Sequence, residues 1–436
     1  MLMVRPDAPP CKQRDNSAGS KRSQKNTTNY PMDTFPHIAI VSLGYPPVPH
    51  VSGFRAHGFA TELASLGCNV TVVTSDSQVS PATPDTATVA DAHDGAVTVI
   101  RAPIDESAQW PARRRPSVLY RHFAAGHAFD WVTAGIDLAA PHLPRGSIVW
   151  GIHGGSSAHE LARRLANSCS GAWIADFKDD WLPPARRGMA RIVESQVTKH
   201  RLASAAMATA ASQLQANDIM NTLHIPTTPI YTGVDIDWWQ QSEPRDLGPT
   251  FNIVYTGHLT YTMDTEILID GFGSAKDTFG DDVRIHYFGT QGDRLREALS
   301  AAGCLAWYVD HGWVSHLEAA RYQRAADLLL YLPLVRSPNV PVKFLEYLAS
   351  QRPIISVPDE RDERFRILRE TSPGVDAATT PSELAQFLTM ALNEWRNHGR
   401  VPDQPRCVSE FAWRPQADRL LAVFRDVAEH HALVNN

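Results

Sequence analysis

From His37 onward, short runs of apolar and β-branched residues alternate with longer runs of helical periodicity. This alternation is typical of parallel sheets whose faces are covered by helices. The first repeat is the clearest: the apolar run at 37–43 passes through a Pro/Gly loop into a helical run at 54–67, and a β-branched run follows at 69–75. Further strands are predicted from the apolar runs that begin at Ala96, Ser147, Ala172, Ala205 and Pro229. Together these segments predict one doubly wound α/β domain.

A second domain is predicted to begin near residue 250, because a polar, Pro/Gly-bearing stretch after Trp239 separates the first alternation from a new one. Its strands are predicted at FNIVYTG, VRIHYFG, AWYVDHG, DLLLYLP and PIISVP, with helices between them. The sequence therefore predicts an α/β fold of two tandem Rossmann-like doubly wound domains, at 36–235 and 236–410, facing each other across a cleft. Ligands are expected in that cleft, because the loops at the carboxyl ends of both sheets can line it.

The two ends of the chain differ from these domains. Residues 1–35 are polar, lysine-rich and without periodicity, which predicts a disordered tail. Met32 shortly precedes the first strand, so an upstream mis-assigned start is an equal alternative to a functional arm. At the other end, residues 411–436 carry one apolar helical stripe made of Trp413, Ala417, Leu420, Leu421 and Phe424.

Composition restricts the class of function. The 436 residues are 43% hydrophobic and 20% charged with a formal charge of -6, which argues against a nucleic-acid binder and leaves small-molecule chemistry as the default. The five cysteines show neither a zinc-binding spacing nor a disulfide framework, and we expect no metal. No apolar run approaches the ~20 residues of a membrane helix, so we expect a cytoplasmic protein.

The segment VPVKFLEYLASQRPIISV, at 340–357, carries the most chemical information. Pro341 suits the first turn of a helix, Lys343 falls inside that turn, and Glu346 lies one turn later on the same side. A helix N-terminus already favours an anion, Lys343 adds a charge, and Glu346 can accept hydrogen bonds from a ribose diol. The alternative is an ordinary amphipathic helix with a surface Lys–Glu pair.

This segment resembles the donor-binding signature of the retaining, family-four type of glycosyltransferases with the B-type (GT-B) fold. Four further segments resemble the same family in matching order, and the resemblance covers nearly the whole chain after residue 36. They are the repeat at 38–74, IADFKDDW at 174–181, IVYTGHL at 253–259 and FAWRPQADRLLAVFRDV at 411–427. The resemblance implies transfer of a sugar from a nucleotide diphosphate sugar, with retention at the anomeric carbon and without a cofactor.

The resemblance also assigns roles on the donor side. Glu346 would hold the ribose hydroxyls and Lys343 the diphosphate, while Gly257 and Gly289 would let strand-end loops approach the donor. Trp313 and Val314 would form the wall of the nucleobase site, although a buried structural Trp is a rival interpretation. Gly53, in the loop after the first strand, would lie near the donor phosphates and the acceptor. The helix at 411–436 would cross back to the N-terminal domain.

The segment IADFKDDW predicts a catalytic cluster of Asp176, Lys178 and Asp179, with Trp181 matching the family and Asp180 replacing its proline. These charges stand at the carboxyl end of a predicted central strand, where open α/β sheets place active-site groups. Mutual pairing of the charges is the structural alternative, because burying three unpaired charges is costly.

The acceptor side is less well defined. His153 follows a predicted strand and is a candidate acceptor contact, although the neighbouring serines suit helix capping. Arg114 lies in a basic, aromatic-flanked segment at 110–123 that could meet an anionic membrane or a lipid phosphate, and a solvated helix face is the equal alternative. A glycan, a lipid-linked molecule or a small molecule all remain as acceptors.

Two departures from the family pattern keep rival functions open. Pro338 stands where many members have an acidic residue eight positions before Glu346, and His258 replaces the first residue of a basic pair. Phosphate charge would then rest on Lys343, with His258 contributing when protonated. The rivals are a sugar-nucleotide epimerase of the same fold and a non-catalytic, glycosyltransferase-like partner subunit.

Overall fold

Apolar strand segments from the first half of the chain assemble into a seven-stranded parallel sheet. The computed structural model describes residues 35–47, 51–76, 97–104, 129–153, 156–181, 188–259, 265–333, 337–357, 362–371 and 378–435. The strands of the first sheet lie in the order β3-β2-β1-β4-β5-β6-β7. They are β1 (Ile38–Val41), β2 (Val70–Ser75), β3 (Val97–Ala102), β4 (Ile148–Ile152), β5 (Ala172–Phe177), β6 (Met207–Ala210) and β7 (Thr227–Pro229).

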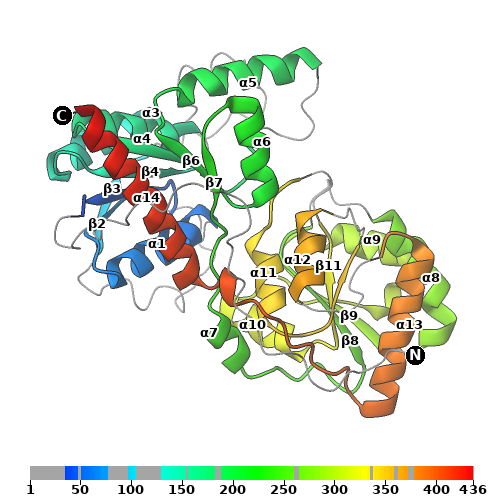
Figure 1. Cartoon of the computed structure of the whole chain (residues 1–436). Helices are drawn as coiled ribbons and strands as arrows, with labels where there is room; N and C mark the ends of the chain where they lie inside the picture. The colour runs from blue at the N-terminus through cyan, green and yellow to red at the C-terminus, as the bar shows by residue number, and fades with distance from the viewer. Residues whose placement is uncertain are drawn as a thin grey trace. The chain divides into compact units, whose positions relative to one another are not determined.

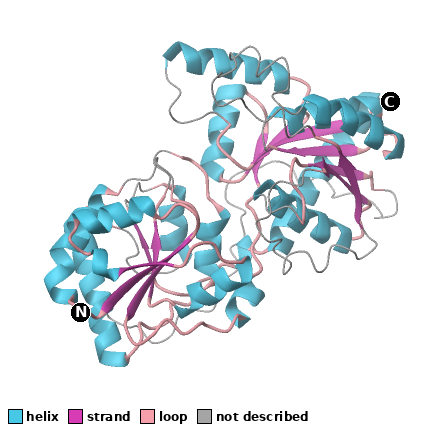
Figure 2. Ribbon diagram, turned by 180° about the vertical axis from the view of Figure 1, so that it is seen from behind, coloured by secondary structure: helices cyan, strands magenta, loops and turns pink. Residues whose placement is uncertain are grey.

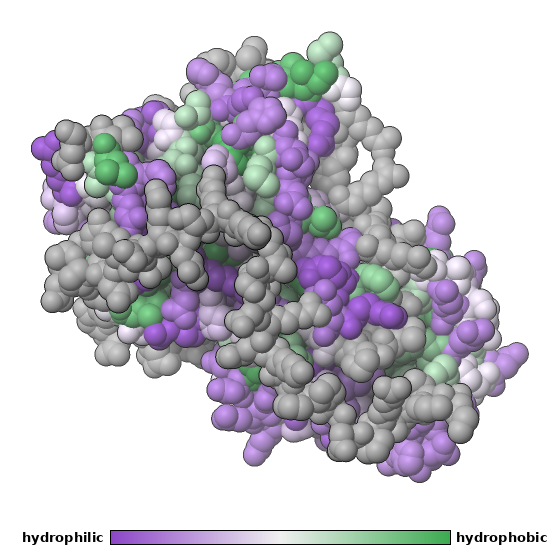
Figure 3. Space-filling view, in the orientation of Figure 1, coloured by the Kyte–Doolittle hydropathy of each residue, from purple (hydrophilic) through white to green (hydrophobic). Residues whose placement is uncertain are grey.

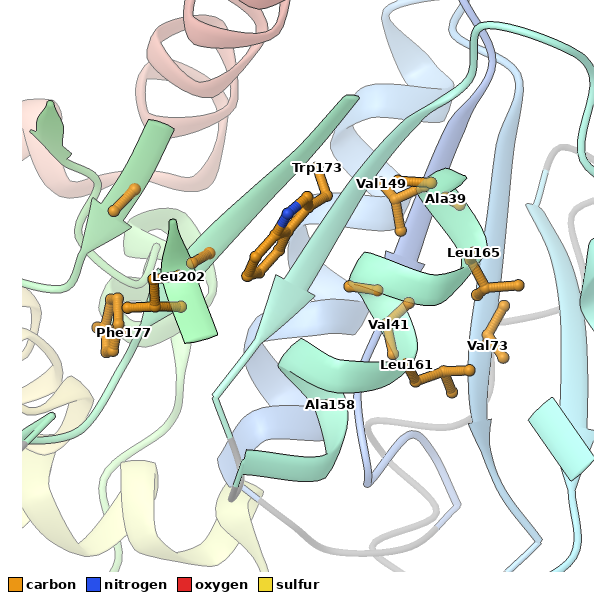
Figure 4. Close-up of a cluster of buried hydrophobic side chains, with 14 of the residues drawn as sticks. Ala39, Val41, Val73, Val149, Ala158, Leu161, Leu165, Trp173, Phe177 and Leu202 are labelled. Atoms are coloured by element: carbon orange, nitrogen blue, oxygen red, sulfur yellow. The ribbon is translucent and has the colours of Figure 1, made fainter. Parts of the chain in front are cut away.

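Helices cover both faces of this sheet (Figure 2). They are α1 (Val51–Ser65), α3 (Phe129–Ala139), α4 (Ser156–Ser168), α5 (Gly188–Leu202) and α6 (Gln213–Leu223), with α14 (Trp413–Asn435) added from the C-terminus. Successive strand residues point to opposite faces. On β4, Val149 belongs to the core under α4, whereas Trp150 packs on the other face against Phe59 of α1. Figure 4 shows Leu161 and Leu165 of α4 among the apolar strand side chains of this core.

The second half of the chain forms a five-stranded parallel sheet in the order β10-β9-β8-β11-β12. Its strands are β8 (Phe251–Thr256), β9 (Val283–Phe288), β10 (Tyr308–Asp310), β11 (Leu328–Tyr331) and β12 (Ile354–Ser356). Its helices are α7 (Ile236–Gln241), α8 (Glu266–Phe279), α9 (Asp293–Ala301), α10 (His316–Ala325), α11 (Val342–Ala349), α12 (Glu363–Thr371) and α13 (Pro381–His398). The order of the strands reverses between β8 and β11, which is the switch point where doubly wound sheets bind ligands.

The chain passes between the two sheets twice, and the two passages pair with each other. Val234 donates its N–H to the Phe411 carbonyl at 3.0 Å and forms an isolated parallel bridge with Ala412. Beyond this bridge α14 packs against α1, as Figure 1 shows for the red and blue helices. The Trp413 ring takes the space beside Gly58 and Gly233, where a Cβ atom would meet it at 2.3 Å. Residues Pro36–Asn436 accordingly form one compact unit.

The predicted α/β fold with two doubly wound sheets is confirmed, with local differences. In place of the strand expected from Pro229, β7 ends at that residue. The Ile230 N–H still donates to the Ala210 carbonyl of β6, and side chains then hold the chain at Ile230 and Tyr231. Pro341 is the N-cap of α11, one position before the first turn. Helices α7 and α12 had no counterpart in the sequence prediction. Residues 1–34 of the predicted tail at 1–35, and the basic segment at 110–123, lie outside the described residues, whereas Phe35 is buried.

The described surface is mostly hydrophilic in the space-filling view, with apolar side chains in small separate areas (Figure 3). The most exposed large apolar side chains are Leu433 at 80% and Met189 at 73%. Among the described residues, no helix is both long and apolar enough to cross a membrane.

The packing of α14 predicts a large difference between two of its side chains. Phe424 is fully buried against Trp150, so Phe424→Ala should lower the free energy of unfolding by about 3 kcal/mol in chemical denaturation. Leu433 on the same helix is the matched control, and Leu433→Ala should change stability by less than about 0.5 kcal/mol. Equally small effects of the two variants would show that the packing of α14 does not contribute to stability.

Candidate functional site

Lys343, in the first turn of α11, points its ammonium group into a cluster of tyrosines. Its Nζ donates to the Tyr255 hydroxyl at 2.8 Å and lies 4.1 Å from the centre of that ring and 5.8 Å from the Tyr331 ring. Burial lowers the pKa of Lys343 to about 7, and the carboxylate of Glu346 opposes that shift. The amine is therefore only partly protonated at neutral pH, and a bound anion would favour its charged form.

Gly257 and Gly289 lie beside Lys343 at the carboxyl ends of β8 and β9. Gly257 has a φ of +100°, and a Cβ there would come within 3.4 Å of the Lys343 side chain. A Cβ on Gly289 would lie 2.4 Å from the Gly257 carbonyl oxygen. Both positions therefore require glycine, which agrees with the close backbone approach expected from the sequence. The structural alternative for Gly289, a strand-end turn glycine, fits the same observation.

His258 belongs to the same group. Its carbonyl accepts from the Tyr255 hydroxyl at 2.8 Å, and its Nδ1 lies 2.9 Å from Thr290 Oγ1. Thr260–Asp264, the remainder of the region where the family has its second basic residue, lie outside the described residues.

Glu346 is held by a histidine that the sequence analysis did not identify. His316, the first residue of α10, lies with Nε2 2.8 Å from Glu346 Oε1. The His316 ring stacks on Trp238 at a centroid distance of 5.4 Å, and Phe54 of α1 packs against it at 5.6 Å. The Glu346 side chain is 10% exposed, so a surface Lys–Glu pair on an ordinary amphipathic helix is not what the structure shows.

Trp313 and Val314 lie just before Ser315, the N-cap of α10. The Gly289 N–H donates to the Gly312 carbonyl at 2.8 Å, which brings the 312–314 segment against the β9 loop. Trp313 is 45% exposed, so it is not the buried structural Trp of the rival interpretation, and Val314 packs partly into the core. A wall for a nucleobase remains a prediction for this pair.

Gly53 lies in the first turn of α1, so it opens that helix as expected, although the helix begins at Val51 and not at Phe54. A Cβ there would come within 3.0 Å of the Gly44 carbonyl and the Tyr45 N–H, which explains the small residue. The next residue, Phe54, contacts His316, so α1 begins close to the Glu346 end of the donor-side group.

Asp176, predicted to be catalytic, is fully buried at the end of β5 in an ion pair with Arg55 of α1. Arg55 donates to its two oxygens at 2.9 and 2.7 Å, and Thr209 donates to Oδ1 at 2.6 Å. Arg55 also donates to Thr232 Oγ1 and to the Ile230 carbonyl. These contacts satisfy the buried carboxylate within the protein and tie the end of β5 to α1, and a catalytic role for Asp176 stays a prediction.

Lys178 and Asp179 pair with each other just beyond β5, which matches the mutual pairing considered from the sequence. The Lys178 side chain is 7% exposed, whereas that of Asp179 is 54% exposed. Burial raises the pKa of Asp180 to about 6, against a hydrogen bond from Ser337. Trp181 donates its indole N–H to Asp218 at 2.6 Å.

His153 follows β4 and lies beside the same strand end. Its N–H donates to the Asp176 carbonyl at 2.9 Å, and its ring stacks on Phe177. Burial and the nearby charge of Lys178 lower its pKa to about 4, so the ring is neutral at pH 7. Its Nδ1 is buried, and no described residue hydrogen-bonds to it. Arg114, the other acceptor candidate, lies outside the described residues.

The described part of the chain contains no group of three or more His, Cys, Asp or Glu side chains placed to hold a metal ion. The structure thus brings together Lys343, Gly257, His258 and Gly289, with Trp313 and Glu346 at the edges. Sequence reasoning missed His316, Phe54 and Arg55. His316 lies two residues after Val314, and Arg55 two residues after Gly53, but neither position carried a signal for its partner.

No family model and no curated protein matches this chain, whereas many solved structures do. HepE from Anabaena, solved with UDP and glucose, aligns with a TM-score of 0.61 and 11% identity over 90% of this chain and 100% of that chain. WaaG, a glycosyltransferase involved in lipopolysaccharide biosynthesis, gives 0.55 and 12% over 91% and 99%. A Listeria monocytogenes protein named as a UDP-N-acetylglucosamine 2-epimerase gives 0.52 and 13% over 91% and 97%. At these identities the likeness shows the fold, which is that of the GT-B glycosyltransferases.

The Arg55–Asp176 pair predicts strong coupling between its two members. Asp176→Asn should lower the free energy of unfolding by about 3 kcal/mol, because it leaves the Arg55 charge buried without its counter-charge. The double variant Arg55→Met with Asp176→Asn should lose less than the sum of the two single losses in chemical denaturation. Additive losses would contradict a direct charge interaction.

Proposed function

We propose that this chain is a glycosyltransferase that takes a sugar from a nucleotide diphosphate sugar. The observation that carries the proposal is Lys343: a partly buried amine at a helix N-terminus, beside Gly257, which itself adjoins Gly289, so that backbone can approach a ligand. A partly neutral amine in an aromatic environment gains charge when an anion binds, which suits a diphosphate. HepE, of the same fold, was solved with UDP, which makes UDP the first nucleotide to test.

In this proposal the donor is a co-substrate, and the chain needs no resident cofactor. Departure of the diphosphate from the anomeric carbon leaves an oxocarbenium-like sugar, so the reaction gains most from positive charge at the phosphates. Lys343 and the N-terminus of α11 supply that charge, and His258 adds to it when protonated. Retention of anomeric configuration, and membership of the family-four branch, rest on the resemblance of the five sequence segments.

Glu346 is proposed to bind the ribose. His316 holds Oε1 of its carboxylate, which orients the group and leaves Oε2 to accept from a ribose hydroxyl. The acceptor would lie toward His153, Lys178 and Asp179, and it could be a glycan, a lipid-linked molecule or a small molecule. Contact of the segment around Arg114 with the membrane surface, and a cytoplasmic location, remain predictions.

Donor binding should depend on the charge of Glu346. A hydrogen bond to a charged group contributes about 1.5–3 kcal/mol, so Glu346→Gln should weaken UDP binding by about 10- to 100-fold in isothermal titration calorimetry. Glu297, an exposed carboxylate on α9, is the matched control, and Glu297→Gln should bind UDP as the wild type does. If Glu346→Gln binds UDP with wild-type affinity, the ribose site is misplaced. Product analysis with UDP-sugars then separates a transferase, which releases UDP, from an epimerase, which releases an altered nucleotide sugar.

The pH dependence of donor binding should follow Lys343. Its free-state pKa is about 7, and the diphosphate raises it, so the affinity is full below pH 7 and falls as the pH rises above 7. UDP-glucose suits this test because it has no terminal phosphate with a pKa near 6. Its dissociation constant should rise about 20-fold from about pH 6.5 to about pH 8.5, with proton uptake on binding. Lys343→Met should bind weakly at every pH, and a pH dependence that survives in this variant would assign it to another group.

A further inference from the structure

Three consecutive residues between β11 and α11 contact the first half of the chain at two places, the segment after β5 and the N-cap of α6. The Ser337 hydroxyl donates to Asp180 Oδ1 at 3.1 Å. The Pro338 carbonyl accepts from the Ser212 hydroxyl at 2.5 Å, at the N-cap of α6. Asn339 donates from Nδ2 to the Lys178 carbonyl at 2.9 Å. This 337–339 segment thus joins the lead-in to α11 with the residues that follow β5.

Of these contacts, that of Asn339 bears most directly on the candidate site. It stands two residues before Pro341, the N-cap of the helix that carries Lys343 and Glu346. The carbonyl that it binds belongs to the peptide between Lys178 and Asp179, so the contact fixes the orientation of that peptide. Its own Oδ1 is buried without a hydrogen-bond partner among the described residues. A buried amide whose oxygen lacks a hydrogen-bond partner costs free energy, and a residue that only held the two halves together would not need such an amide.

Adhesion between the two halves is already provided by Glu363 of α12. Its carboxylate accepts from the N–H groups of Gln213 at 3.0 Å and Leu214 at 2.8 Å, and from the Tyr231 hydroxyl. A carboxylate at the N-terminus of α6 is favourable for the helix dipole as well. The hydrogen bonds of Glu363 go neither to Lys178 nor to α11. Its link to the candidate catalytic segment is indirect and runs through α6, where Gln215 donates to the Asp179 carbonyl at 2.5 Å.

We propose that Asn339 is a positioning residue for glycosyl transfer, which holds the Lys178–Asp179 peptide in register with the donor on α11. This inference rests on the proposed function. The side chain acts through the backbone of Lys178 and does not contact the nucleotide. Loss of the bond leaves the donor site intact and lets the Lys178–Asp179 pair drift, and displacement of a catalytic group by about 1 Å can cost about 100-fold in rate.

The test uses UDP-glucose hydrolysis for turnover, UDP calorimetry for donor affinity, and hydrogen–deuterium exchange of the 174–181 region. Asn339→Ala should lower kcat by about 10- to 100-fold while the dissociation constant for UDP stays within about twofold. Exchange should rise at 174–181 and stay unchanged at 343–349. Asn339→Gln retains the amide donor and should recover part of the lost kcat.

Glu363→Gln is the comparison variant, because it weakens the contact between the halves without touching Lys178. It should lower the melting temperature at least as much as Asn339→Ala does, but lower kcat less. A kcat for Asn339→Ala within about twofold of wild type overturns the inference, as does unchanged exchange at 174–181. If the wild type neither binds UDP nor hydrolyses UDP-glucose, the proposed function with this donor fails, and the exchange data still decide whether Asn339 holds the peptide.

Discussion

The buried ion pair between Arg55 and Asp176 is the interaction on which the rest of the structure depends. Both side chains are fully buried, and the two oxygens of the carboxylate accept from the same guanidinium. A charge pair in this environment is tolerated only when its remaining donors and acceptors are satisfied, and Thr209, Thr232 and the Ile230 carbonyl complete the set. The pair therefore fixes α1, the end of β5 and the chain after β7 at one point.

The charge of Lys343, on the candidate donor side, is held in a different way. Lys343 contacts a tyrosine hydroxyl and aromatic ring faces, and burial lowers its pKa to about 7. An amine in such surroundings is stabilised less than an ion pair, so free energy remains to be gained when an anion arrives. Asp176 is satisfied within the protein, whereas Lys343 is left able to respond to a ligand, which is the difference expected between a positioning residue and a binding residue.

The sequence predicted what is encoded locally. β-branched runs predicted the strands, and Lys343, Gly257 and Gly289 stood at strand ends or helix starts where backbone geometry narrows the choice of residue. The partners of these residues could not be predicted in the same way. Asn339 meets Lys178 across 161 positions, Glu363 meets Gln213 across 150, and His316 meets Glu346 across 30. Such contacts arise from tertiary packing, and a single sequence carries no periodicity that reports them. At Asp176 the charge at a strand end was visible in the sequence, whereas its partner Arg55, 121 positions away, was not.

The passage between the two halves connects these features. Residues 230–232 contact both the ion pair and Glu363. The Ile230 carbonyl and the Thr232 hydroxyl accept hydrogen bonds from Arg55, whereas the Tyr231 hydroxyl donates to Glu363. The Tyr231 N–H donates to Gln416 of α14 at 2.9 Å, and Val234 pairs with Phe411. Three residues thus link the ion pair that sets the end of β5 to the carboxylate that caps α6 from the other half. These residues lie beyond the end of β7, so contacts that connect Asp176 to Glu363 are made by a segment outside the strands of either sheet.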